Sequence, residues 1–292
     1  MLDLTQVRAF VAVVEHGGFS RAAAVLETTQ PVVSQQVRKL ETAVGARLLV
    51  RSHARTVPSE AGQRFLPHAR ALLRAEQRAR DSLAGAALTV AASTNIGAYL
   101  LPPVIDAYVR RTAAPPPDLL LGTNPETVDR LESGAADLAL MEWWDDRPGF
   151  AARHWRTEPL IVIVNPAHPW AAREDVEKAE LFDAPLIGGE PGTGTGQRLR
   201  QVFGPSVSRL RTALTVGSTA AVKEAVKAGL GISIVMAASA AEELRHGTLH
   251  GLRIADAALA KDLYAILPVD LPETALAIRF DRFLAEAAPS TV

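Results

Sequence analysis

The chain has 292 residues, of which 48% are hydrophobic and 22% are charged, so it is long enough to form two domains with cores of their own. It contains no cysteine, which excludes disulfides, cysteine-ligated zinc and cysteine nucleophiles. Its net charge of −1 is unevenly divided: residues 1–84 hold twelve Lys/Arg against seven Asp/Glu, and residues 85–292 hold nineteen against twenty-five. This asymmetry suggests two separate roles, although an imbalance of this size also arises by chance in a short segment.

The N-terminal segment is predicted to hold three helices. Apolar residues recur at helical spacing over residues 4–15, and a Gly-Gly pair ends that helix. Ser20 is expected to cap a second, alanine-rich helix over residues 21–26. A Thr-Thr pair then precedes a third helix with Pro31 in its first turn, where the missing N–H costs nothing.

The third helix has two different faces. One face is apolar and consists of Val33, Val37, Leu40 and Val44. The second carries Gln30, Pro31, Ser34, Gln35 and Arg38, whose polar side chains can bind base edges and phosphates. A helix, a tight turn and a helix of this kind are typical of a helix-turn-helix, whereas an ordinary three-helix bundle remains the alternative.

The stretch FSRAAAVLETTQPVVSQQVRKLETAVGARLLVRSHARTVPSEAG, residues 19–62, resembles the DNA-binding region of LysR-type transcriptional regulators. It carries that family's Gln-Pro-x-x-Ser-x-x-Val-x-x-Leu-Glu helix, followed by Gly-x-x-Leu-x-x-Arg. Leu49 stands in place of the usual phenylalanine, Ser59 in place of the usual threonine, and Gln35 where many relatives have arginine. The last difference bears on base preference and leaves DNA binding as the expectation.

The resemblance implies a winged helix-turn-helix, with short strands near residues 48–50 and 56–57 and a wing at 51–55. The implied contacts to double-stranded DNA are Ser20, Arg21, Thr29, Gln30, Pro31, Ser34, Gln35, Arg38, Arg51, His53 and Arg55.

A long amphipathic helix is predicted from Ser59 to about residue 83, with Pro67 inside it. Its apolar stripe consists of Phe65, Ala69, Leu72, Ala79 and Leu83. Such a stripe needs a partner, which is either the chain itself or a second copy. The resemblance implies the second copy, and therefore a homodimer or homotetramer, with a hinge at residues 84–86.

From residue 87 onward, short apolar strands alternate with helices, which predicts parallel α/β architecture in two sets. The fold class is therefore α+β multidomain: a winged helix-turn-helix, a linker helix, and two α/β subdomains that resemble a periplasmic binding protein. The expected boundaries are 1–58 for DNA binding, 59–86 for the linker and 87–292 for effector binding. The two subdomains would comprise 87–160 with 268–292, and 161–267.

Four predicted strand-to-helix turns offer hydroxyls, amides and helix N-termini, which together would bind a small anionic effector. The candidate effector-binding residues are Ser93, Thr94, Asn95, Thr123, Asn124, Trp143, Thr193, Gly194, Thr195, Ser218 and Thr219. Plain N-capping is the alternative for each turn, and Trp143 is as well suited to filling a subdomain interface as to stacking on a ligand. Gly196 stands where relatives often have arginine, and whether Arg198 replaces that charge stays open.

The sequence contains no catalytic or metal-binding constellation. Its seven histidines are scattered, and neither a P-loop nor a Gly-x-Ser-x-Gly elbow is present. No enzyme activity, cofactor or metal is expected. The N-terminus lacks the pattern of a secretory signal, and no apolar run reaches the roughly 18 residues of a membrane span. These features predict a cytoplasmic regulator with no membrane partner rather than a secreted solute-binding protein.

Overall fold

The computed structural model describes residues 2–52, 55–84, 87–189, 193–255 and 257–287. It divides into two compact units, the first built mainly from residues 1–87 and the second mainly from residues 88–292. His53, the Gly85-Ala86 part of the expected hinge, and Glu190 to Gly192 lie outside the described residues.

The first unit begins with three helices, α1 (Leu4–His16), α2 (Phe19–Val25) and α3 (Gln30–Val44). Asp3 caps α1, and Gly17 ends it in the left-handed region at φ 65°, which a residue with a Cβ rarely adopts. The cap of α2 is Gly18, and Ser20 lies inside the helix, so the predicted cap was wrong by two residues. Pro31 lies in the first turn of α3, as predicted.

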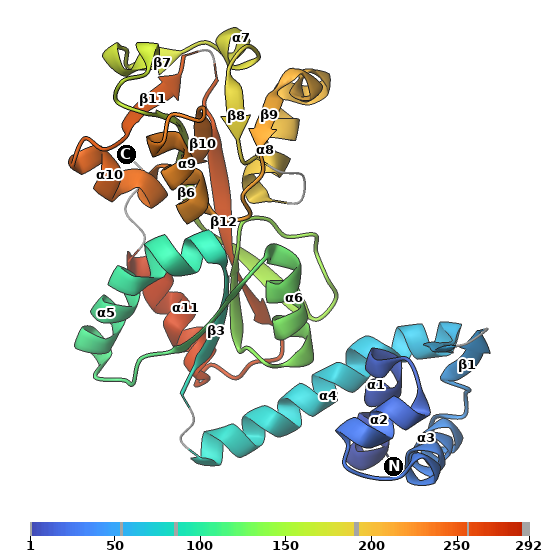
Figure 1. Cartoon of the computed structure of the whole chain (residues 1–292). Coiled ribbons are helices and arrows are strands. Elements are labelled where there is room, and N and C mark those ends of the chain that lie inside the picture. The colour runs from blue at the N-terminus through green and yellow to red at the C-terminus, as the bar shows by residue number, and fades with distance from the viewer. Residues whose placement is uncertain (1, 53–54, 85–86, 190–192, 256, 288–292) are drawn as a thin grey trace. The chain divides into compact units, whose positions relative to one another are not determined.

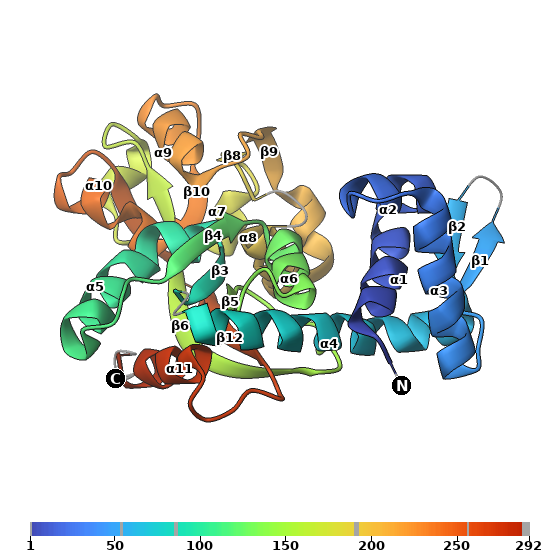
Figure 2. The ribbon, with the colours of Figure 1, turned by 90° about the horizontal axis from the view of Figure 1, so that it is seen from below.

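Two short strands and a long helix complete this unit (Figure 2). The strands β1 (Leu49–Ser52) and β2 (Arg55–Pro58) pair antiparallel, and α4 (Glu60–Ala84) follows them. The core is formed by the apolar faces of α1 and α3 together with Ala69 of α4. The helix α4 continues through Pro67.

The apolar stripe of α4 is divided between two environments. Ala69 is fully buried, and the ring of Phe65 lies 5.7 Å from that of Phe10 in α1. The prediction that Ala69 lies between two chains was wrong, because it is fully buried within this unit, whereas Phe65 is half-buried beside α1. Leu72 and Ala79 remain exposed, and the side chain of Leu83 lies outside the description.

The described residues of the second unit form ten strands and the helices between them. The strands are β3 (Thr89–Ser93), β4 (Asp118–Gly122), β5 (Leu138–Met141), β6 (Phe150–Val164), β7 (Asp175–Val176), β8 (Pro185–Ile187), β9 (Arg211–Leu214), β10 (Ser233–Met236), β11 (His250–Ile254) and β12 (Ala260–Pro268). The α-helices are α5 (Leu101–Thr112), α6 (Asn124–Ser133), α7 (Lys178–Leu181), α8 (Gly194–Phe203), α9 (Thr219–Lys227), α10 (Ala241–Arg245) and α11 (Leu276–Ala287). A π-helical turn, Ile96–Leu100, precedes α5.

The main sheet is mixed, with strand order β4-β3-β5-β12-β6-β11-β7 and β10 paired to β6. Only part of the predicted parallel pairing is present: β3 is parallel to β4 and β5, whereas β12 runs antiparallel to both β5 and β6. The strand β6 pairs with β12 through its first part and with β10 and β11 through its last part. Figure 1 shows β12 as a long strand through the length of this unit.

The C-terminal helix α11 packs against α5, the first α-helix of the unit. Tyr108 of α5 lies edge-on to Phe280 and Phe283 of α11, at ring separations of 4.9 and 5.3 Å. Edge-to-face contacts between buried rings add to the stabilisation from buried area. None of the described helices is both long and apolar enough to cross a membrane.

Candidate DNA-binding surface and effector pocket

The polar face of α3 is exposed, and its predicted residues lie together. Gln30, Pro31, Gln35 and Arg38 are exposed, and Ser34 is half-buried between them. The guanidinium of Arg38 donates to the hydroxyl of Ser34 at 3.2 Å, one turn earlier on the helix. Side chains that are held in place on a helix face can meet base edges at a low entropic cost.

The turn after α3 is held by a carboxylate and a glycine, both within the stretch 19–62 that resembles the LysR-type DNA-binding region. Glu41 accepts hydrogen bonds from the backbone N–H of Leu48 and Leu49, at 2.7 and 3.2 Å. A Cβ at Gly62 would lie 2.0 Å from the carbonyl oxygen of Leu48, so only glycine permits this approach of α4. Ser59 caps α4 by accepting from the N–H of Gly62 at 3.0 Å.

The remaining DNA-binding candidates lie on α2, its flanking turn and the paired strands. Ser20, Arg21 and Thr29 are exposed, and Arg21 donates to the carbonyl of Gly17 at 3.3 Å. Arg51 lies in β1 opposite Thr56 of β2. Arg55 begins β2, and His53 lies outside the described residues.

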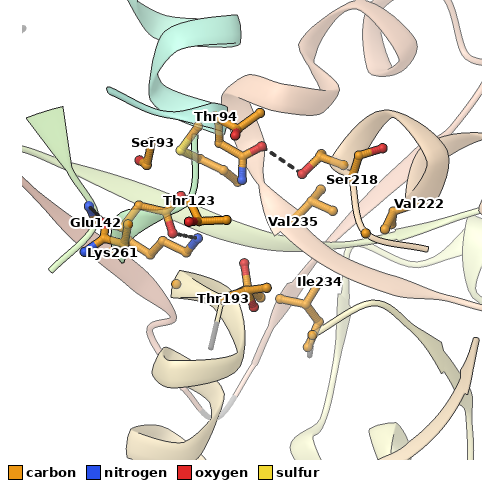
Figure 3. A pocket seen from close by; sticks show the side chains of 18 of the residues that line it. Ser93, Thr94, Thr123, Glu142, Thr193, Ser218, Val222, Ile234, Val235 and Lys261 are labelled. Carbon is orange, nitrogen blue, oxygen red and sulfur yellow. Dashed lines mark hydrogen bonds and ion pairs between the residues drawn. The ribbon is translucent and has the colours of Figure 1, made fainter. Parts of the chain in front are cut away.

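All eleven candidate effector-binding residues line one cavity of about 170 Å³ in the second unit. They come from the ends of β3, β4 and β5 and from the first turns of α6, α8 and α9 (Figure 3). The same cavity is lined by Gly122, Glu142, Gly189, Gly217, Val222, Lys261 and the four residues of β10. The residues that were predicted from the strand-to-helix turns therefore lie together in the fold.

Several of these polar groups already have structural partners. The Thr94 hydroxyl donates to the carbonyl of Gly122 at 3.0 Å, and the Thr123 hydroxyl donates to Glu126 at 3.0 Å. The Asn124 amide donates to the carbonyl of Trp143 at 3.0 Å and accepts from a backbone N–H at 3.1 Å. For these three residues, hydrogen bonds within the protein are enough to explain why a polar side chain is present.

Two other hydroxyls at the cavity can still donate a hydrogen bond to a ligand. Ser218 caps α9 by accepting from the N–H of Ala221 at 3.2 Å, which leaves its proton to be donated. Ser93 is 5% exposed, and its hydroxyl has no hydrogen-bond partner among the described residues. A buried hydroxyl without a partner is costly, so Ser93 is suited to meeting a ligand.

Two charged residues that were not among the predicted site residues, Glu142 and Lys261, also line this cavity. The ammonium of Lys261 lies 2.9 Å from Oε2 of Glu142. Glu142 directly follows β5, a position where functional side chains are common and which could have revealed it. Lys261 lies in β12, a strand that the sequence analysis did not predict.

Arg198, the possible substitute for the arginine that relatives often have at position 196, lies outside the cavity. Its guanidinium donates to the side chain of Gln201 at 3.1 Å. Gly196 lies within α8 and donates its N–H to Thr193 at 3.0 Å. No cluster of three or more His, Asp or Glu residues that could hold a metal occurs in the described parts of the chain.

Two family models match this sequence. Residues 4–63 match "Bacterial regulatory helix-turn-helix protein, lysR family", and residues 82–289 match "LysR substrate binding domain". The chain belongs to the LysR family of transcriptional regulators. It is a DNA-binding regulator with an effector-binding domain, and its relatives are regulators rather than enzymes.

The relatives of this LysR-type regulator extend over both units. A protein of Stutzerimonas stutzeri named as an HTH-type transcriptional regulator, PtxE, is 42% identical over 196 residues, which are 67% of this chain and 100% of that protein. A RuBisCO operon transcriptional regulator of Allochromatium vinosum is 31% identical over 240 residues, 80% of this chain and 79% of that protein.

Solved structures share the fold. ArgP from Mycobacterium tuberculosis superposes with a TM-score of 0.70 at 24% identity, over 99% of this chain and 98% of ArgP. Full-length CbnR complexed with its target DNA has a TM-score of 0.59 at 24% identity, over 99% of this chain and 100% of CbnR.

Proposed function

We propose that this regulator is controlled by a small anion that binds in the cavity of the second unit. The observation that carries the proposal is the convergence of the ends of three strands and the first turns of three helices on one cavity. Helix N-termini and hydroxyl donors favour negative charge. The only charged side chains that line the cavity among the described residues, Glu142 and Lys261, neutralise each other.

DNA recognition is proposed for the exposed face of α3. Arg38 and Gln35 would reach base edges in the major groove, and the strand pair β1–β2 would lie beside the phosphate backbone. Because the target is DNA, we propose that the protein acts in the cytoplasm.

Assembly is proposed through the exposed part of α4. Leu72 and Ala79 would meet a second copy, which gives a homodimer or homotetramer with two sets of DNA contacts. We assign residues 1–58 to DNA binding, 59–86 to the linker and 87–292 to the effector, with subdomains at 87–160 plus 268–292 and at 161–267.

A ligand screen on the full-length chain tests effector control. A ligand that binds the native state raises the melting temperature with its concentration. Small anions are expected to do so and to change the affinity for promoter DNA, and Ser218→Ala should require more ligand for the same shift. Stabilisation by cations or wholly apolar compounds alone would contradict the anionic effector.

A further inference from the structure

The cavity contains a charge pair that is almost removed from solvent. The side chains of Lys261 and Glu142 are 3% and 6% exposed, and their charged atoms lie 2.9 Å apart (Figure 3). Taking two charges out of water is costly, and apolar residues of similar size are often at least as stable. Stability alone is therefore a weak explanation for a charge pair at this position.

The carboxylate of Glu142 also faces the start of α8. A Cβ built on Gly194, the first residue of that helix, would lie 1.5 Å from Oε2 of Glu142. Glycine is thus required for the carboxylate to approach this end of the helix, where negative charge is favoured. Of the helix N-termini at the cavity, the start of α8 is therefore already faced by a negative group of the protein itself.

The remaining donors lie around the rest of the cavity. Ser93 offers a buried hydroxyl without a partner among the described residues, and Ser218 offers its proton at the start of α9. A ligand in the cavity would meet hydroxyl donors at Ser93 and Ser218 and the carboxylate at Glu142. Lys261 uses one lone pair of the carboxylate, and an ionised carboxylate can accept further hydrogen bonds but donate none.

We infer that Glu142 is a specificity-determining residue that selects a small oxyanion carrying its own O–H or N–H donor. The ligand's negative oxygens face Ser93, Ser218 and the start of α9, and its donor faces Glu142. An anion without a donor places an oxygen against the carboxylate and is rejected by repulsion. This inference rests on the proposed effector site and specifies the ligand class that the site accepts.

Three matched pairs of probes test the inference on the full-length chain. Hydrogen phosphate, bicarbonate and glycine each carry a donor, whereas sulfate, nitrate and acetate have related shapes and none at neutral pH. The phosphate and bicarbonate pairs report an inorganic ligand, and the glycine pair reports a zwitterion. Calorimetry should show at least one donor-bearing probe binding about tenfold or more tighter than its partner.

Variants at the carboxylate provide the second arm. In Glu142→Gln the amide can donate, so the preference within that pair should fall at least about tenfold. If the single variant does not fold, the double variant Glu142→Gln, Lys261→Met replaces it. This double variant removes both charges with side chains of similar shape, and it should also lose the preference. Glu174→Gln is the matched control, because this exposed carboxylate lies 3.6 Å from Arg253 and does not line the cavity.

The outcomes separate this inference from the proposed regulation. Equal binding within every pair, an unchanged preference in the folded Gln variants, or no binding of any probe would overturn the role of Glu142. Regulation by the cavity would still stand if another compound raised the melting temperature and altered DNA binding. Conversely, a donor-bearing probe that binds without changing DNA affinity supports the selectivity of Glu142 and contradicts effector control.

Discussion

The hydroxyl of Thr219 donates a hydrogen bond to the side-chain oxygen of Asn95 at 2.8 Å, and this bond links the start of α9 to the second residue after β3. Both residues line the cavity, so the protein itself joins two of its walls. Thr219→Val keeps the shape and removes the donor, and should lower the free energy of unfolding by about 0.5–1.5 kcal/mol. Urea denaturation measures the change.

Thr248→Val is the control for this experiment, because Thr248 is exposed and its hydroxyl makes only a long contact of 3.4 Å to the carbonyl of Glu243. Equal losses in the two variants would show that the Asn95–Thr219 bond makes no specific contribution.

Ser93→Ala should separate stability from ligand binding. The Ser93 hydroxyl is buried without a partner among the described residues, so its removal relieves a desolvation cost of about 1–3 kcal/mol. We expect an unchanged or higher melting temperature without ligand and weaker binding of the effector. Calorimetry and thermal unfolding on the same samples test both parts, and a lower melting temperature without ligand would argue for a structural role.

Arg38→Ala should reduce specific DNA binding more than nonspecific binding, because a good base contact is typically worth about 1–3 kcal/mol of discrimination. Lys39→Ala, on the same helix, is the comparison: an exposed ammonium acts as a charge and should affect both kinds of binding similarly. Titrations of operator and random duplexes at several salt concentrations give the ratio. An unchanged ratio in Arg38→Ala would exclude α3 from base recognition.

Leu72→Asp places a charge in the exposed part of the α4 stripe, where the leucine is 37% exposed in the single chain. If a second copy covers this residue, burial of the unpaired charge is costly and the assembly should dissociate. Size-exclusion chromatography with light scattering should report a smaller species. Gln77→Asp, on another face of α4, should keep the parent mass, and an unchanged mass for both variants would remove Leu72 from the interface.

The carboxyl group of Glu180 provides a pH prediction. Its paired hydrogen bonds from Arg173, at 2.7 and 2.8 Å, and one from the N–H of Glu177 lower its pKa to about 2. Because the folded pKa lies below the ordinary value of 4.5, the stabilisation is present above that value and is lost as the pH falls toward 2. NMR titration should show the low pKa, and Arg173→Met should raise it.

The N-terminal unit was predictable because its elements are specified locally. Gly17 and Pro31 mark helix boundaries through their own backbone preferences, and the apolar stripe of α3 faces the core as its spacing requires. The cap of α2 was missed because serine at position 20 is also tolerated inside a first turn, and Gly18 has no side chain that indicates a cap.

The second unit was predictable only where strands read as short apolar runs. The strand β6 begins ten residues before its apolar part, and polar side chains such as Arg156 and Glu158 conceal that portion. The strand β12 was also not predicted, although it contains the apolar run 263–267, and Lys261 in its polar first part was missed with it. The Glu142–Lys261 pair joins residues 119 positions apart, a separation that no local pattern encodes.

The strand pair β6–β12 has a mechanical consequence. Nine residue pairs from Ala260–Pro159 to Pro268–Phe150 form a ladder whose register shifts once, between Leu263 and Tyr264, and β6 then continues beyond it into the region of β10 and β11. Any rotation of the strands around the first part of β6 relative to β10 and β11 must twist this ladder about its long axis. We therefore expect any movement of the domain on ligand binding to be a shallow torsion rather than a wide opening, and we expect amides within the ladder to exchange with solvent last.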